Sequence, residues 1–129
     1  MQRVGVDIIE IKRIEKAVSR WGNVFLNRVY TDSELQIYGN KPSSLAARFS
    51  GKEAVIKALG SNRVAYRDIE IIPDDSGKPH VNLYGKAGKR AKDIGVQNLA
   101  VSLSHCRDYA VACAVSELYP VGGVPPDLL

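Results

Sequence analysis

One segment constrains the fold more than any other: residues 43–60, SSLAARFSGKEAVIKALG, which predict the clearest helix in the chain. Ser43 or Ser44 is the expected N-cap, and Gly60 marks the expected end. The apolar residues of the segment recur at helical spacing and define one stripe: Leu45, Phe49, Ile56 and Leu59. We therefore expect a single long helix that packs through this stripe.

The rest of the chain alternates between strand and helix signals. Short apolar runs predict strands at 4–9, 68–72, 79–84, 99–104 and 109–115. Helical spacing predicts helices at 11–21 and 86–94 and a short helical turn at 25–29. Thr31, with Glu34 three residues later, predicts a capping box for another helix. We expect an α+β fold, in which a largely antiparallel sheet packs against one long helix and shorter helices.

The composition is that of one ordinary globular domain. The chain has 129 residues and a formal net charge of +4, a mild excess that favours acidic partners without choosing among them. Its two cysteines predict buried, reduced thiols. No apolar run is long enough to span a bilayer, so we expect a cytoplasmic protein. The expected organisation is a single domain at 1–117 and a Pro/Gly-rich tail at 118–129.

Asp7 is an anomaly, because it lies between Val6 and Ile8 inside an otherwise apolar strand. A buried carboxylate is costly unless it is paired or bound to a metal ion. The structural alternative is that Asp7 lies at the strand end and helps to cap the helix that follows. Position alone leaves both interpretations open.

Charged residues on the long helix form a second anomaly. Glu53 and Lys57 are four residues apart and share one face, while Arg48 and Lys52 share a neighbouring face. The structural alternative is a solvated surface with one ion pair. Against it, Gly51 interrupts the helix where alanine would be more stable, which suggests that something approaches closely there.

His105 follows a predicted strand in the segment SLSHCRDY. It has the chemistry to contact a phosphate or to transfer a proton. The alternative is a strand-end histidine that is hydrogen-bonded to the backbone, and the residues alone do not decide between the two.

These segments together resemble one family. In order, VGVDIIEIKRI, RVYTDSEL, LAARFSGKEAVIKALG, DIEI, DDSGKPHV and VSLSHCRDYAVA are similar to the bacterial holo-acyl-carrier-protein synthases, the short class of phosphopantetheinyl transferases. The resemblance covers about Val4 to Val115. Its strongest motifs are Gly5–Asp7 and Lys52–Ala58. It implies the 4′-phosphopantetheinyl transferase fold, and a Mg²⁺-dependent enzyme that moves 4′-phosphopantetheine from coenzyme A to a carrier-protein serine and releases adenosine 3′,5′-bisphosphate.

The resemblance also implies roles for individual residues. Asp7 and Glu53 would bind Mg²⁺ together with the coenzyme A pyrophosphate, in keeping with the preference of this ion for carboxylates, phosphates and water. Glu53, Lys57 and His105 would act in catalysis, with either Glu53 or a metal-bound water as the proton acceptor. The remaining implied contacts, to the phosphates or the nucleotide, come from four residues: Arg48, Lys52, Lys57 and His105.

Partners follow from the same resemblance. An acidic acyl carrier protein would dock on basic residues of the first helix and the segment after it: Arg13, Arg20 and Arg28. The family forms homotrimers with active sites between subunits, and we expect neither nucleic acid nor a membrane as a partner. Two other functions stay open: a different Mg²⁺-dependent phosphoryl transferase or hydrolase acting on coenzyme A-like nucleotides, and a non-catalytic basic binding module.

Overall fold

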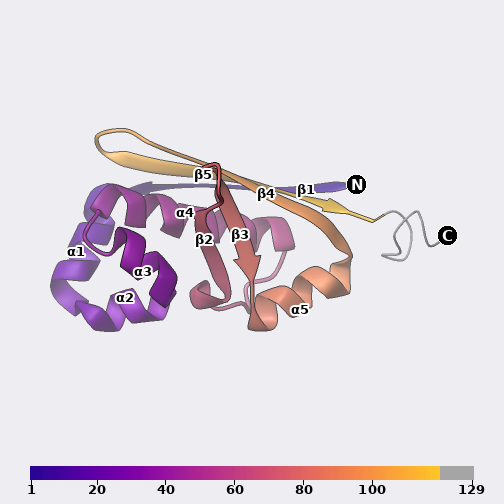
Figure 1. Ribbon diagram of the computed structural model, residues 1–129, viewed down its shortest axis with the longest axis horizontal. Coiled ribbons are helices and arrows are strands. Elements are labelled where there is room, and N and C mark those ends of the chain that lie inside the picture. Colours follow the sequence, from indigo (N-terminus) through magenta and orange to yellow (C-terminus); the bar gives the residue numbers. More distant parts are fainter. Residues whose placement is uncertain (120–129) are drawn as a thin grey trace.

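The computed structural model describes residues 1–119 (Figure 1). The elements follow one another in this order: β1 (Gln2–Glu10), α1 (Ile11–Trp21), α2 (Asn23–Val29), α3 (Asp32–Tyr38), α4 (Pro42–Leu59), the 3-10 helix η1 (Tyr66–Asp68), β2 (Ile69–Pro73), β3 (Pro79–Leu83), α5 (Gly85–Ile94), β4 (Val96–His105) and β5 (Tyr109–Leu118). The predicted α+β class is confirmed, and every expected element is present with small shifts at its ends.

Two antiparallel sheets form the β part of the fold. The larger sheet has the strand order β1-β5-β4, and β2 and β3 form a two-stranded hairpin. Figure 1 shows the three long strands along one side of the molecule and the helices on the other. The first and last strands of the chain therefore pair with each other in the larger sheet, with Asp7 opposite Ala112.

Helix α4 packs very closely against β1 and β5. The strand residues that face it on β5 are small and buried: Ala110, Ala112 and Ala114. Gly5 on β1 is so close to the helix that a Cβ atom there would lie 1.9 Å from the carbonyl oxygen of Ala54. This close approach fixes the distance between β1 and α4, the two elements that carry the predicted metal ligands.

The opposite face of the larger sheet is apolar and open to solvent. On β1, Val4, Val6 and Ile8 are between 58% and 64% exposed. The register places them across from Val115, Cys113 and Val111 of β5. Both cysteines are free and exposed, so the expectation that they are buried was wrong. For Cys113 the reason is that alternate residues of β5 face away from α4.

Two local expectations for the long helix were also wrong. The N-cap is Lys41, with Pro42 in the first turn, so neither Ser43 nor Ser44 caps the helix. Nor does the helix bury a single stripe, because β strands and neighbouring helices cover most of its circumference and bury Ala46, Ala47 and Lys52 along with the apolar residues. Its predicted end is confirmed, since Gly60 adopts a left-handed conformation with φ of 66°.

The capping box before α3 is confirmed in both directions. The Thr31 side chain accepts a hydrogen bond from the Glu34 amide at 3.2 Å, and the Glu34 carboxylate accepts one from the Thr31 amide at 2.9 Å. Glu34 is fully buried, which a capping box alone does not require.

The domain limits expected from the sequence stay a prediction. Strand β5 runs to Leu118, one residue into the predicted tail, and the remainder of that tail from residue 120 lies outside the described residues. In residues 1–119, no helix is both long enough and apolar enough to cross a membrane. The expected cytoplasmic location also stays a prediction.

Candidate active site

Asp7 lies on the side of β1 that faces α4. Its side chain is 19% exposed, and its carboxylate forms an ion pair with Lys57 Nζ at 3.5 Å. Asp7 is well inside the strand, since β1 continues for three residues beyond it. The structure therefore does not support the alternative in which Asp7 caps α1, and the N-cap of that helix is Glu10.

Glu53 projects from α4 into the same cavity as Asp7. This cavity has a volume of about 420 Å³ and is lined by the two acids, Arg13, Phe49 and Tyr66, with apolar residues of β1, α1 and α2. Glu53 Oε1 accepts a hydrogen bond from the Tyr66 hydroxyl at 2.5 Å. The fold thus brings together two carboxylates that are far apart in the sequence, at one cavity wall.

Tyr66 is a member of this site that the sequence did not indicate. It lies in η1, just before β2, and its ring packs against Phe49 with centroids 5.2 Å apart. Burial raises the pKa of Tyr66 to about 12, helped by the hydrogen bond to Glu53 and the charges of Glu53 and Asp7. The phenol is therefore protonated at neutral pH and acts as a donor to the carboxylate.

Lys57 connects the acidic cavity to a second, basic one. Its ammonium group donates to the Val6 carbonyl oxygen at 2.9 Å and pairs with Asp7, so the Glu53–Lys57 ion pair of the solvated-surface alternative does not form. Lys57 also lines an open cavity of about 670 Å³ with Gly60, Arg63 and Arg90. The side chain is 53% exposed, which leaves it accessible to an anionic ligand.

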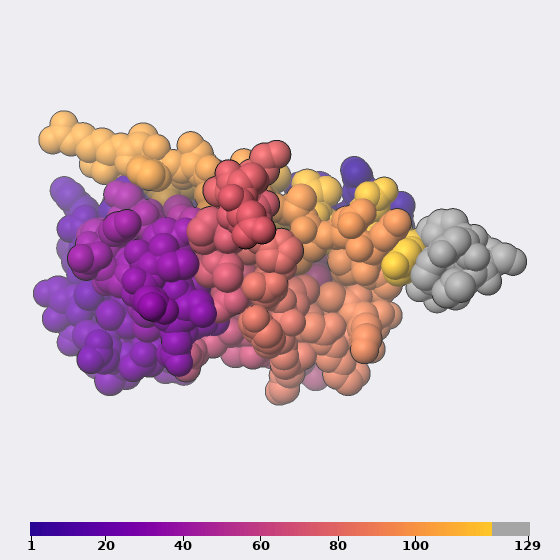
Figure 2. All heavy atoms as spheres, in the orientation of Figure 1, coloured from indigo at the N-terminus to yellow at the C-terminus, as the bar shows by residue number. Residues whose placement is uncertain are grey.

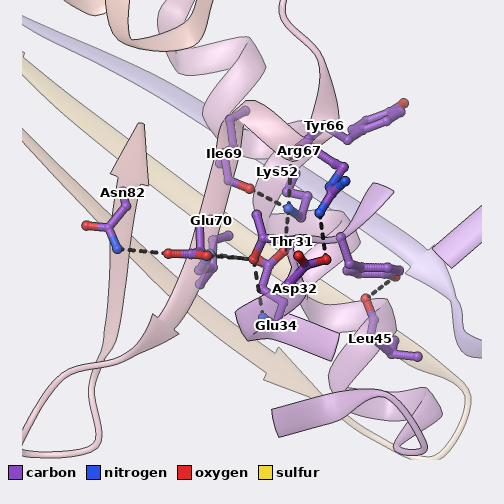
Figure 3. Close-up of polar contacts among 12 residues, drawn as sticks. Thr31, Asp32, Glu34, Leu45, Lys52, Tyr66, Arg67, Ile69, Glu70 and Asn82 are labelled. Carbon is purple, nitrogen blue, oxygen red and sulfur yellow. Dashed lines mark hydrogen bonds and ion pairs between the residues drawn. The ribbon is translucent and has the colours of Figure 1, made fainter. Parts of the chain in front are cut away.

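Lys52 is buried and lines neither cavity, so the structure does not support the expectation that it binds the cofactor. Its side chain is fully buried and forms a 2.7 Å ion pair with Glu34 (Figure 3). The same ammonium group donates to the carbonyl oxygens of Tyr66, at 3.1 Å, and of Ile69. Because an ammonium group has three donors, these partners use all of them. Burial lowers the pKa of Lys52, and the nearby Glu34 carboxylate opposes that shift.

Gly51 has a structural explanation. A Cβ atom there would lie 2.5 Å from Ile71 Cδ1 and 3.1 Å from Leu103 Cδ2. The close approach expected at this glycine therefore comes from core side chains of β2 and β4 and not from a ligand.

Arg48 packs on Tyr38 of α3. Its guanidinium lies 3.8 Å from the centre of the ring and donates to the Tyr38 hydroxyl at 2.7 Å. Its Nε atom is buried and has no hydrogen-bond partner within residues 1–119. Burial lowers the pKa of this guanidinium. A role for Arg48 in contacting phosphate stays a prediction.

His105 is exposed at the end of β4 and is not among the residues that line the cavity of Asp7 and Glu53. Figure 2 shows the β4–β5 hairpin projecting beyond the body of the molecule. In the larger sheet His105 pairs with Ala110 of β5, which in turn pairs with Ile9 of β1. Its catalytic role stays a prediction.

The expected docking arginines are all exposed on α1 and α2. Arg13 lines the acidic cavity, Arg20 lies 4.9 Å from the ring centre of Trp21, and Arg28 is in the last turn of α2. Trp21 is itself 55% exposed. The exposed side chains of α1 and α2 therefore include three arginines and one large aromatic residue.

The chemistry of the acids suits a magnesium ion with few protein ligands. The described part of the chain contains no group of three or more His, Cys, Asp or Glu residues placed to hold a metal ion. Mg²⁺ is usually held by one or two carboxylates, with water and substrate phosphates completing the coordination. Two carboxylates that line one cavity, with the ammonium group of Lys57 beside Asp7, fit that pattern, whereas a closed protein site for another ion would need more donors.

Comparisons with known proteins agree in both sequence and structure. Residues 3–114 match the model of the 4′-phosphopantetheinyl transferase superfamily. A holo-[acyl-carrier-protein] synthase of Dehalococcoides mccartyi is 49% identical over 118 residues, covering 91% of this chain and 99% of the relative. The same enzyme of Herpetosiphon aurantiacus is 46% identical, covering 86% and 94%.

Solved structures with the same fold include complexes with coenzyme A. The Helicobacter pylori holo-[acyl-carrier-protein] synthase in complex with coenzyme A has a TM-score of 0.80 and 33% identity, covering 88% of this chain and 99% of that one. A second coenzyme A complex, that of the Chronobacterium ammoniagenes ACPS, has a TM-score of 0.81 and 31% identity, covering 92% and 98%.

Proposed function

This chain belongs to the holo-[acyl-carrier-protein] synthases, and we propose that its Asp7–Glu53 cavity is where 4′-phosphopantetheine passes from coenzyme A to a serine of an acyl carrier protein. The transfer from coenzyme A to the carrier is the activity of this family of transferases. One observation carries the assignment of the site: two carboxylates, from β1 and α4, line the same cavity. Lys57 pairs with one of them, Asp7, and also lines the neighbouring basic cavity.

The reaction is a displacement at phosphorus. The carrier serine oxygen would form a bond to the β-phosphorus of coenzyme A while the bond to the bridging oxygen breaks, which releases adenosine 3′,5′-bisphosphate. The serine hydroxyl proton would pass to Glu53 or to a water molecule. A Mg²⁺ ion held by Asp7 and Glu53 would neutralise negative charge on the phosphate oxygens. Lys57 would bind the pyrophosphate and stabilise the leaving group, since it is half exposed and already lies beside Asp7.

The position of Arg13 supports an approach of the carrier protein over α1. It is a docking arginine that also lines the acidic cavity, so a partner bound to it lies next to the two carboxylates. Arg20 and Arg28 would extend this contact along α1 and α2. Opposite charges on two proteins steer their encounter and set their orientation, which is the role proposed for these three side chains.

The test is a transfer assay with two measurements. Mixed with apo carrier protein, coenzyme A and Mg²⁺, the protein should add one phosphopantetheine group to the carrier, detected as the corresponding mass gain. Added salt should raise KM for the carrier because it screens the docking charges. A carrier that gains no mass would contradict the function, and a KM for the carrier that salt does not change would contradict the docking surface.

A homotrimer is supported by the apolar outer face of the larger sheet. Val4, Val6 and Ile8 lie side by side with Val111 and Val115 of β5, and an exposed apolar patch of this kind marks an interaction surface. We propose that copies of the chain cover this face. Neighbouring subunits could then also supply residues, such as His105, that do not line the cavity of the acids within one chain.

Val6→Asp tests this assembly, because a carboxylate at the centre of the apolar face would be costly to bury. The unsubstituted chain of 14.1 kDa should have a solution mass of about 42 kDa as a trimer, and the variant should shift toward the monomer. Light scattering after size exclusion measures both. Val24→Asp, at an exposed position on α2, should leave the mass unchanged. A monomeric unsubstituted protein would contradict the trimer.

A further inference from the structure

We infer that Tyr66 is a positioning residue for the metal site: its hydroxyl holds one oxygen of Glu53 and leaves the other available to a divalent cation. The inference rests on the proposed function, because it assumes that Glu53 is a ligand. The role inferred for Tyr66 is exerted through its hydrogen bond to the Glu53 carboxylate.

The geometry assigns the two oxygens of Glu53 different environments. The Tyr66 hydroxyl donates to Oε1 at 2.5 Å. No group within residues 1–119 donates a hydrogen bond to Oε2. Because the phenol is a single donor on a stiff ring, it restricts the rotation of the glutamate side chain without occupying both oxygens. A ligand held in place by a hydrogen-bonded neighbour loses less conformational entropy when the cation binds.

The Tyr66 ring is itself held in place. It packs against Phe49, which is one turn before Glu53 on α4. Tyr66 thus contacts both Phe49 and Glu53, and all three side chains line the cavity.

The backbone of Tyr66 is anchored by the buried ion pair described above (Figure 3). Lys52 donates to the carbonyl oxygens of Tyr66 and Ile69, so it holds the first residue of η1 and the residue that follows this helix. Its partner Glu34 accepts a hydrogen bond from the Ile71 amide at 2.8 Å, which ties β2 to α3. Lys52 therefore supports the metal site indirectly, by fixing the segment that carries the phenol.

Tyr66→Phe removes the hydroxyl and keeps the ring against Phe49. The probe is Mn²⁺, which shares with Mg²⁺ a preference for oxygen ligands, and its free concentration is measured by electron paramagnetic resonance. Loss of a hydrogen bond to a metal ligand typically costs about 10–100-fold in metal affinity, so we expect Mn²⁺ binding to the protein with coenzyme A to weaken about tenfold. The Mg²⁺ concentration for half-maximal transfer should rise by a similar factor, with KM for the carrier unchanged.

Tyr84→Phe is the matched control, because that phenol also donates to a carboxylate, Glu70, but lies outside the cavity. It should leave Mn²⁺ affinity unchanged. Asp7→Asn removes a proposed metal ligand, so it tests the metal site independently of the positioning role of Tyr66. If Asp7→Asn weakens Mn²⁺ binding and Tyr66→Phe does not, the positioning role is overturned and the metal site stands. If neither substitution weakens it, the metal site and the positioning role both fail.

Discussion

Asp7→Asn should lower the rate of phosphopantetheine transfer by at least about a thousand-fold, because a bound metal ion contributes several kcal/mol of charge stabilisation to the transition state. Asparagine keeps the size of the side chain and removes its charge. The fold should survive, since the Lys57 side chain that pairs with Asp7 is 53% exposed and stays solvated when the pair is lost. Such pairs contribute about 0–1 kcal/mol to stability. Mass spectrometry of the carrier at saturating coenzyme A measures the rate.

The control for this substitution is Asp93→Asn on α5, where an exposed aspartate pairs with Lys89 at 2.8 Å. It makes the same chemical change away from the cavity and should leave the rate and the melting temperature unchanged. Transfer by Asp7→Asn at more than about a tenth of the unsubstituted rate would overturn the assignment of Asp7 as a ligand.

Lys52→Met should lower the free energy of unfolding more than Asp7→Asn, Lys57→Met or Tyr66→Phe. Methionine fills much of the space of the lysine but leaves the fully buried Glu34 carboxylate without its ion partner. Removing one member of a buried pair costs about 3–5 kcal/mol in free energy of unfolding. For a chain of this size that corresponds to a melting temperature lower by about 10–20 °C, measured by circular dichroism at one fixed protein concentration.

Lys57→Met provides the comparison, since it is the same substitution five residues further along the same helix. Its ammonium group is 53% exposed, so the melting temperature should change little while transfer is strongly reduced. If Lys52→Met has the melting temperature of the unsubstituted protein, Lys52 is not the structural lysine. If Lys57→Met keeps full transfer activity, Lys57 is not the functional one.

Much of the local structure follows from the sequence. The spacing of Thr31 and Glu34 is enough to predict a capping box, because both partners lie within one turn of helix. Gly60 predicts the end of α4 in the same way, since a left-handed residue after a helix favours glycine. The carboxylate within an apolar strand singled out Asp7, the family resemblance implied its role, and Asp7 does line a cavity with Glu53.

Other features depend on which elements meet in space. Lys52 and Lys57 belong to one motif on one helix, and nothing local distinguishes them. Burial of Lys52 results from α3, η1 and β2 closing around that side of α4, which provides a carboxylate and two carbonyl oxygens. Tyr66 likewise carries no signal of its own. Its hydroxyl meets Glu53 across two elements, and Lys52 of the same helix also donates to the Tyr66 carbonyl oxygen.

The sequence alone determined the elements, their order, the family and the acids of the site, because these depend on patterns within short segments and on motifs that recur in order. Tertiary structure decided which charged side chains are buried and which remain available to a ligand. The physical reason is that the free energy of a charge depends on the groups packed around it, and those groups come from elements that are distant in the chain.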